Sequence, residues 1–82
     1  MPGTEQEFSF TLHLSVPELT DQIADALYGA GCDDALAGMS GGVVFLDFTR
    51  VARSYEDAVQ SAIADVRSIG IEATLAPNEA DN

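Results

Sequence analysis

The strongest pattern in the chain is a one-sided apolar stripe between residues 54 and 70. Its members recur at the three- and four-residue spacing that places them on one face of a helix, and they are Ala58, Val59, Ala62, Ile63, Val66 and Ile69. Ser54 is positioned to cap the first turn, with Asp57 where a capping box has its acidic residue, and Gly70 supplies a left-handed stop. The pattern predicts an amphipathic helix that packs on a sheet.

Alternation of apolar and polar residues predicts a half-buried strand from residue 7 to residue 16. One side of this strand carries Phe8, Phe10, Leu12, Leu14 and Val16, and the other carries Ser9, Thr11, His13 and Ser15. Pro17 ends the strand and suits the first turn of a helix, so a helix is predicted over residues 18–28. The inward residues of that helix are Leu19, Ile23, Ala26 and Leu27.

Three more strands are predicted beyond this helix. A weak strand over residues 35–39 is followed by a hairpin loop at 40–42 and by a strand over 43–49. Residues 50–53 are read as a connector to the second helix. A last strand is predicted over 71–76, with inward residues Ile71, Ala73 and Leu75.

The element order βαββαβ predicts a ferredoxin-like sandwich of the α+β class when the crossovers are right-handed. In this fold a four-stranded antiparallel sheet carries two helices on one face. A chain of 82 residues fits one domain, which we place at residues 7–76, with flexible termini at 1–6 and 77–82.

The second face of the predicted sheet is open, and it offers a candidate interface made of His13, Val43, Phe45 and Asp47. Val43 and Phe45 are the apolar centre that a homodimer would use. A pair formed by His13 and Asp47 could polarise a proton or bind a metal, although a surface histidine beside an aspartate is the commoner arrangement. Neither a nucleophile nor a third ligand accompanies the pair, so we predict no catalytic residue, metal or cofactor.

The chain is strongly acidic, with 14 Asp and Glu against 3 Lys and Arg and a formal net charge of −11. This charge argues against direct binding to nucleic acid or to an anionic membrane, because both would repel the protein. It suits a basic protein surface as partner, including that of a nucleic-acid-binding complex. The acidity could also serve solubility alone.

Cys32 is the single cysteine, which excludes an intrachain disulfide and a cysteine-based zinc site. The aspartates that follow it would raise the pKa of its thiol, so we predict a small packed residue rather than a nucleophile. No apolar run of signal-peptide or membrane-spanning type is present, and a cytoplasmic location is expected.

A row of acidic side chains is the candidate partner-binding site, and its members are Glu18, Asp21, Asp25, Asp33 and Asp34. Asp21 and Asp25 would lie roughly 6 Å apart along a helix axis. That separation is close to the rise of about 7 Å over two phosphate steps of duplex DNA. Such a row could meet arginines and lysines of a partner, although ordinary solvated helices show the same spacing.

Three segments, ADALYGAGCDDA, VVFLDFTR and SYEDAVQSAIADV, resemble a family of small acidic bacterial and phage proteins that is mostly uncharacterised. The resemblance extends from the first strand to the second helix and implies a shared fold without an activity. In size, charge and lack of a catalytic constellation the chain is also similar in type to phage anti-CRISPR proteins.

These patterns together predict a non-enzymatic acidic protein that binds and inhibits or regulates a larger protein. In its sharper form the prediction is a nucleic-acid mimic of anti-CRISPR type that blocks a DNA- or RNA-binding groove. The alternative is a small-ligand-sensing or dimerising regulatory domain without mimicry.

Overall fold

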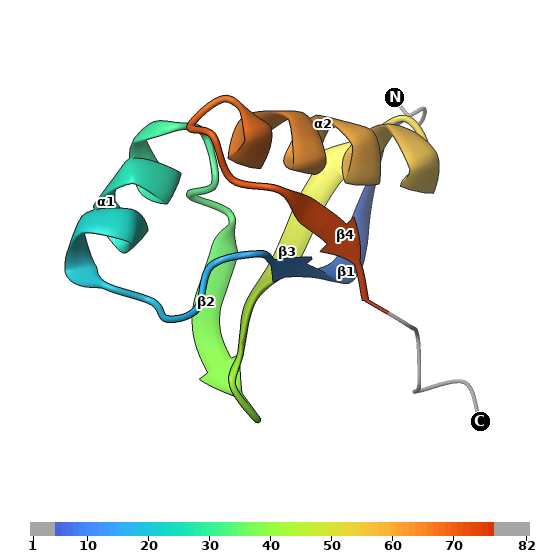
Figure 1. The fold of residues 1–82 in the computed structure, drawn as a ribbon. Helices are drawn as coiled ribbons and strands as arrows, with labels where there is room; N and C mark the ends of the chain where they lie inside the picture. Colours follow the sequence, from blue (N-terminus) through green and yellow to red (C-terminus); the bar gives the residue numbers. More distant parts are fainter. Residues whose placement is uncertain (1–4, 77–82) are drawn as a thin grey trace.

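The computed structural model describes residues 5–76, which form one four-stranded antiparallel sheet and two helices (Figure 1). The elements are β1 (Gln6–Leu14), α1 (Asp21–Gly29), β2 (Ala35–Ser40), β3 (Val43–Ala52), α2 (Tyr55–Arg67) and β4 (Ala73–Leu75). Their order across the sheet is β2-β3-β1-β4, with every neighbouring pair antiparallel. The predicted α+β class and ferredoxin-like element order are confirmed.

The central strands β1 and β3 supply most of the core because their alternating residues face the same side. Their register sets Phe10 opposite Phe48 and Leu12 opposite Leu46. The rings of Phe10 and Phe48 stack with centroids 5.2 Å apart. The buried residues of the core are Phe10, Leu12, Leu14, Leu27, Cys32, Val44, Leu46, Phe48, Ala58, Val59, Ala62, Val66 and Ala73.

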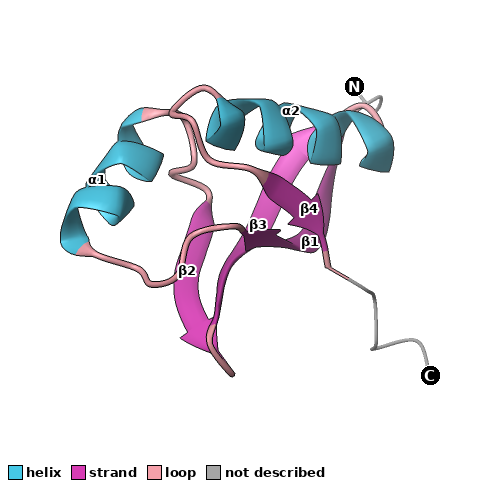
Figure 2. Ribbon diagram, in the orientation of Figure 1, coloured by secondary structure: helices cyan, strands magenta, loops and turns pink. Residues whose placement is uncertain are grey.

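Helix α2 packs across β1, β3 and β4, and Figure 2 shows it lying over the centre of the sheet. The Ser54 hydroxyl accepts a hydrogen bond from the Asp57 amide at 3.0 Å, which confirms the predicted N-cap. The helix ends at Arg67, and Gly70 adopts a positive φ of 83° as predicted. Of the predicted stripe, Ile63 and Ile69 pack against the core without being fully buried.

Helix α1 begins three residues later than predicted, at Asp21, because Thr20 is its N-cap. The Thr20 hydroxyl accepts from the Ile23 amide at 3.1 Å, so the chain from Pro17 to Thr20 stays outside the helix. Of this helix only Leu27 is buried. Figure 1 shows α1 beside the β2 end of the sheet, away from the centre that α2 covers. The two helices therefore do not share the sheet face equally.

The β2–β3 hairpin closes through a two-residue turn, and Ser40 lies in β2 opposite Val43. Gly41 and Gly42 have φ angles of 58° and 83°, the positive values that a type I′ turn requires at both central positions. The predicted three-residue loop was therefore one residue too long. A side chain at either glycine would strain the turn.

The bounds of β3, β4 and β1 also differ from the prediction. β3 continues to Ala52 through the predicted connector, so Arg50 belongs to a strand. β4 has only three residues, and Leu75, which was expected to face inward, is 43% exposed. β1 starts at Gln6, in the predicted flexible terminus, and ends at Leu14, two residues before the predicted end of the strand. The remaining predicted flexible segments, 1–4 and 77–82, lie outside the described residues.

Replacing Leu46 with Ala should lower the free energy of unfolding by about 2–5 kcal/mol, because it leaves a cavity between the central strands and α2. The matched control is Leu75→Ala, which removes the same atoms from a half-exposed position and should cost less than about 1.5 kcal/mol. Urea denaturation of both variants measures the difference. Equal losses would contradict the assigned core.

Candidate functional site

Arg50 makes the densest group of polar contacts among residues 5–76, and its side chain is only 11% exposed. Its Nε donates to Asp34 Oδ2 at 2.8 Å, and its Nη2 donates to Asp34 Oδ1 at 3.0 Å. This two-pronged contact matches the planar guanidinium to the planar carboxylate. It ties the turn before β2 to the far end of β3.

The remaining donors of Arg50 reach α2 and the end of α1. Nη1 donates to Ser61 Oγ at 3.1 Å and lies 3.1 Å from Asp65 Oδ2, while Nη2 also donates to the Gly31 carbonyl at 3.0 Å. The guanidinium carbon lies 4.9 Å from the centre of the Phe48 ring. One side chain thus joins the α1–β2 turn, β3 and α2.

Position 31, next to the ion pairs of Arg50, requires a glycine. Its φ is 111°, a backbone conformation that glycine adopts at little cost. A Cβ at this position would lie 2.9 Å from Asp65 Oδ2. A larger residue would therefore disturb the carboxylate that pairs with Arg50.

The contacts in this cluster stabilise both charges. The hydrogen bond from Arg50 lowers the pKa of the Asp34 carboxyl below its usual 3.8, outweighing the effect of partial burial. The same hydrogen bond raises the pKa of the Arg50 guanidinium. Asp34 therefore stays ionised and engaged at neutral pH.

Cys32 lies in the core next to this cluster. Burial raises the pKa of its thiol to about 11, and the charges of Asp65, Asp34 and Asp33 add to the shift while Arg50 opposes it. The thiol is therefore protonated at neutral pH. The structure confirms the prediction of a small packed residue.

The predicted acidic row contains four exposed carboxylates and one that is paired within the fold. Asp21 and Asp25 are exposed on α1, Glu18 is exposed before it, and Asp33 is exposed in the turn that follows. Asp34 is instead turned onto Arg50 and is the member whose charge is already paired. The strand alternation could have revealed this, because continuing the inward series Val44, Leu46 and Phe48 places an arginine on the buried face, where it needs a partner.

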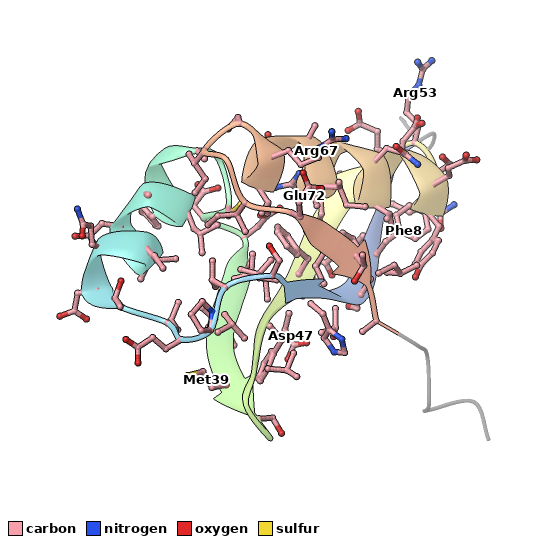
Figure 3. All side chains as sticks on the ribbon, in the orientation of Figure 1. Phe8, Met39, Asp47, Arg53, Arg67 and Glu72 are labelled. Atoms are coloured by element: carbon pink, nitrogen blue, oxygen red, sulfur yellow. The ribbon has the colours of Figure 1, made fainter. Side chains whose placement is uncertain are left out.

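No lysine or arginine precedes Arg50 in the sequence. The other two cations, Arg53 and Arg67, appear near α2 in Figure 3, and Arg67 Nε lies 3.9 Å from Glu72 Oε1. The exposed carboxylates around α1 therefore belong to a stretch, residues 1–49, that contains no lysine or arginine. The next cation in the chain, Arg50, is engaged by Asp34 and Asp65. We call Glu18, Asp21, Asp25 and Asp33 the α1 acidic surface.

On the open sheet face, the register separates His13 from Asp47. His13 lies opposite Phe45, while Asp47 lies opposite Thr11, whose hydroxyl donates to the Asp47 carboxylate. Among the described residues, no hydrogen bond joins His13 to Asp47. The arrangement thus brings the two residues to one face without assembling them into a pair.

Phe45 covers Gly38 of the neighbouring strand, where a Cβ would come within 2.7 Å of the ring. Part of the aromatic surface proposed for a homodimer is therefore already used within the chain. Val43, the second apolar residue of that surface, remains 39% exposed.

A hollow of about 780 Å³ borders this face. Asp47 contributes to its lining and His13 does not; the lining residues are Ser9, Phe10, Thr11, Asp33, Asp34, Ala35, Leu36, Asp47, Phe48, Thr49, Tyr55, Leu75 and Ala76. The lining of this hollow therefore combines hydroxyl and carboxylate groups with apolar side chains.

Within residues 5–76 no three His, Cys, Asp or Glu side chains are grouped closely enough to hold a metal ion. Neither described helix combines the length and apolar character of a membrane-spanning segment.

The chain matched no protein-family model, no curated protein and no solved structure.

Stability should depend on pH through Asp34. A carboxyl whose pKa is lower in the folded than in the unfolded state stabilises the fold above its unfolded pKa, and this contribution is lost as the pH falls through the folded value. The free energy of unfolding of the wild type should therefore decrease between about pH 5 and pH 2, and Asp34→Asn should show a shallower decrease. Denaturant titrations across this range provide the measurement.

Asp33→Asn is the control for this experiment, since Asp33 is exposed and makes no ion pair with Arg50. It should retain the pH dependence of the wild type. If Asp34→Asn and Asp33→Asn behave alike, the coupling between Asp34 and Arg50 does not contribute to stability.

Proposed function

We propose that this chain is a cytoplasmic, non-catalytic acidic protein that binds a basic surface of a larger protein and inhibits or regulates it. The observation that carries the proposal is the α1 acidic surface, whose exposed carboxylates form no ion pair with any arginine among residues 5–76. Unpaired exposed charges of one sign attract an oppositely charged partner and speed its association.

The contacts of Arg50 support this proposal because they show which carboxylates are paired inside the fold and which are not. Asp34 and Asp65 pair with Arg50 inside the fold. Within the described part of the chain the carboxylates of the α1 acidic surface make no such pair, so a partner would not have to break an ion pair there to engage them. Their charge is free for arginines or lysines of another protein.

The sharper form of the proposal is nucleic-acid mimicry, in which the acidic surface occupies a DNA- or RNA-binding groove, as an anti-CRISPR protein could. Asp21 and Asp25 are one helical turn apart on α1, which separates their backbone positions by roughly 6 Å along the axis. Two phosphate steps of duplex DNA rise by about 7 Å. This near match supports mimicry without requiring it.

The hollow beside the open sheet face favours a second candidate function. Its volume of about 780 Å³ is in the range of small-molecule sites, and it combines the Asp47 carboxylate with hydroxyl groups and apolar residues. A small-ligand-sensing regulatory domain would use such a site. Isothermal titration with pooled polar metabolites would detect this binding.

The double charge reversal Asp21→Lys with Asp25→Lys should weaken partner binding by at least about tenfold, because it replaces attraction by repulsion at the basic surface. A pull-down from a bacterial lysate would supply the partner, and surface plasmon resonance would measure the affinity. Affinity for the wild type should fall steeply as salt rises, since exposed charges are screened over about 8–10 Å at physiological ionic strength.

The matched control is Glu7→Lys with Glu72→Lys, which changes the net charge equally at exposed positions outside the α1 acidic surface. Circular dichroism would verify that both variants fold. Equal binding by the two variants would contradict the acidic-surface proposal. A duplex or RNA that fits the groove of the partner should compete, and failure to compete would exclude mimicry while leaving the protein interaction intact.

A further inference from the structure

β2 is an edge strand with an unpaired outer side. It is the first strand in the order β2-β3-β1-β4, and within residues 5–76 no backbone hydrogen bond reaches its outer side. Its sequence, ALAGMS, contains neither a charge nor a proline. Proteins usually protect exposed edges with such residues, because a free strand edge is a template for another strand.

The pairing with β3 determines which backbone groups of β2 are free. The Thr49 amide donates to the Asp34 carbonyl at 3.0 Å, so Asp34 turns its carbonyl toward β3. Alternate residues of an antiparallel strand point to the same side, and Leu36, Gly38 and Ser40 therefore also bond β3. The outward-pointing amides and carbonyls belong to Ala35, Ala37 and Met39.

The side chains of β2 leave apolar surface uncovered on both faces of the sheet. Leu36 is 77% exposed on the open face. Met39 and Ala37 lie on the other face of the sheet, whose central strands are covered by α2. Met39 is 46% exposed there, and Ala37 is exposed as well. Figure 3 shows Met39 near the hairpin end of β2. Burial of these groups would favour association at this edge.

We propose that β2 pairs antiparallel with β2 of a second copy of this chain, about a twofold axis at Ala37. This register sets Ala37 opposite its own counterpart and Ala35 opposite Met39 of the second copy. All three outward-pointing residues then form hydrogen-bonded pairs. The four strands of each copy join into one continuous sheet.

The side chains fit this register. Leu36 comes to lie opposite Gly38 of the second copy, where its side chain would pack against the outer edge of the Phe45 ring that fills the space above this glycine. A shift by one residue would place opposite faces of the two sheets together. A shift by two residues, with the axis at Gly38, would set Ala35 opposite the Gly41 turn and leave two hydrogen-bonded pairs instead of three.

The charge distribution also favours a second copy at this edge. With a net charge of −11, two copies repel each other over most of their surface. The carboxylates nearest the axis belong to Asp47, which lies opposite Leu36 on β3, and to Asp34 at the start of β2. The two Asp47 residues would be about 16 Å apart and the two Asp34 residues about 20 Å apart. Both distances exceed the Debye length of about 8 Å at physiological ionic strength. The uncharged edge is therefore a surface where two copies can approach.

The inference is independent of the proposed function and concerns a different surface from the α1 acidic surface. The dependence on salt distinguishes them. Added salt should strengthen the pairing of two acidic copies by screening their repulsion, whereas it should weaken binding to a basic partner.

Sedimentation equilibrium from micromolar to millimolar concentration tests the proposal with full-length protein. The wild type should shift from 8.6 kDa toward twice that mass. Ala37→Glu places two carboxylates opposite each other at the axis and should raise the dissociation constant by about tenfold or more. Ala37→Gln, a neutral side chain of the same size at the same exposed position, should dimerise markedly better than Ala37→Glu.

Cross-linking gives a second readout that does not depend on tight association. Ala37→Cys should form a disulfide-linked dimer under oxidised glutathione, because the axis brings the two thiols together. Val51→Cys, at another exposed strand position, is the control and should cross-link far more slowly. Cys32 is buried and should not interfere.

Three results would each overturn the proposal: a wild type that stays monomeric at millimolar concentration, Glu and Gln variants with equal dissociation constants, or equal cross-linking at positions 37 and 51. A dimer disrupted by Phe45→Ser but unaffected by Ala37→Glu would place the interface on the open sheet face instead.

Discussion

The packing of Arg50 under α2 is the interaction on which the rest of this small structure depends. A domain of this size buries a limited apolar core, and its stability is a small difference between large terms. The guanidinium bonds the turn that ends α1, the turn that starts β2, and two residues of α2. Its carboxylate partners remain partly exposed, so the contribution is that of a hydrogen-bonded network at the edge of the core, on the order of 1–3 kcal/mol.

This pairing also decides which acidic residues serve the fold and which remain for binding. Asp34 and Asp65 compensate a cation that would otherwise be buried alone, so neutralising them would cost stability. The α1 acidic surface makes no ion pair among residues 5–76, although Asp21 in the first turn of α1 interacts favourably with the helix dipole. The proposed basic partner would therefore meet charges that are not engaged in ion pairs, and the proposed second copy would meet the uncharged β2 edge.

The sequence predicted the parts of the fold that periodicity determines, namely the strand alternation around Leu12 and Leu46 and the helical stripe around Ala62. It failed where a single side chain decides between local alternatives. Pro17 and Thr20 are both suitable at a helix start, and the hydroxyl of Thr20 was the better cap. Arg50 was placed in the connector between the third strand and the second helix, and its partners Asp34 and Asp65 lie 16 and 15 residues away in the chain, so no local pattern shows these contacts. The exposed β2 edge follows from the strand order β2-β3-β1-β4, which is a property of the whole fold and not of a local pattern.

A double-mutant cycle between Arg50 and Asp34 tests the central claim most directly, since it isolates their coupling from the effect of either substitution alone. Free energies of unfolding would be measured for Arg50→Met, Asp34→Asn and the combined variant. The Arg67→Met and Glu72→Gln cycle provides the comparison at an exposed, 3.9 Å pair. We expect a coupling of about 1 kcal/mol or more for Arg50 with Asp34 and less than about 0.5 kcal/mol for the exposed pair. Equal, negligible couplings in both cycles would contradict the account.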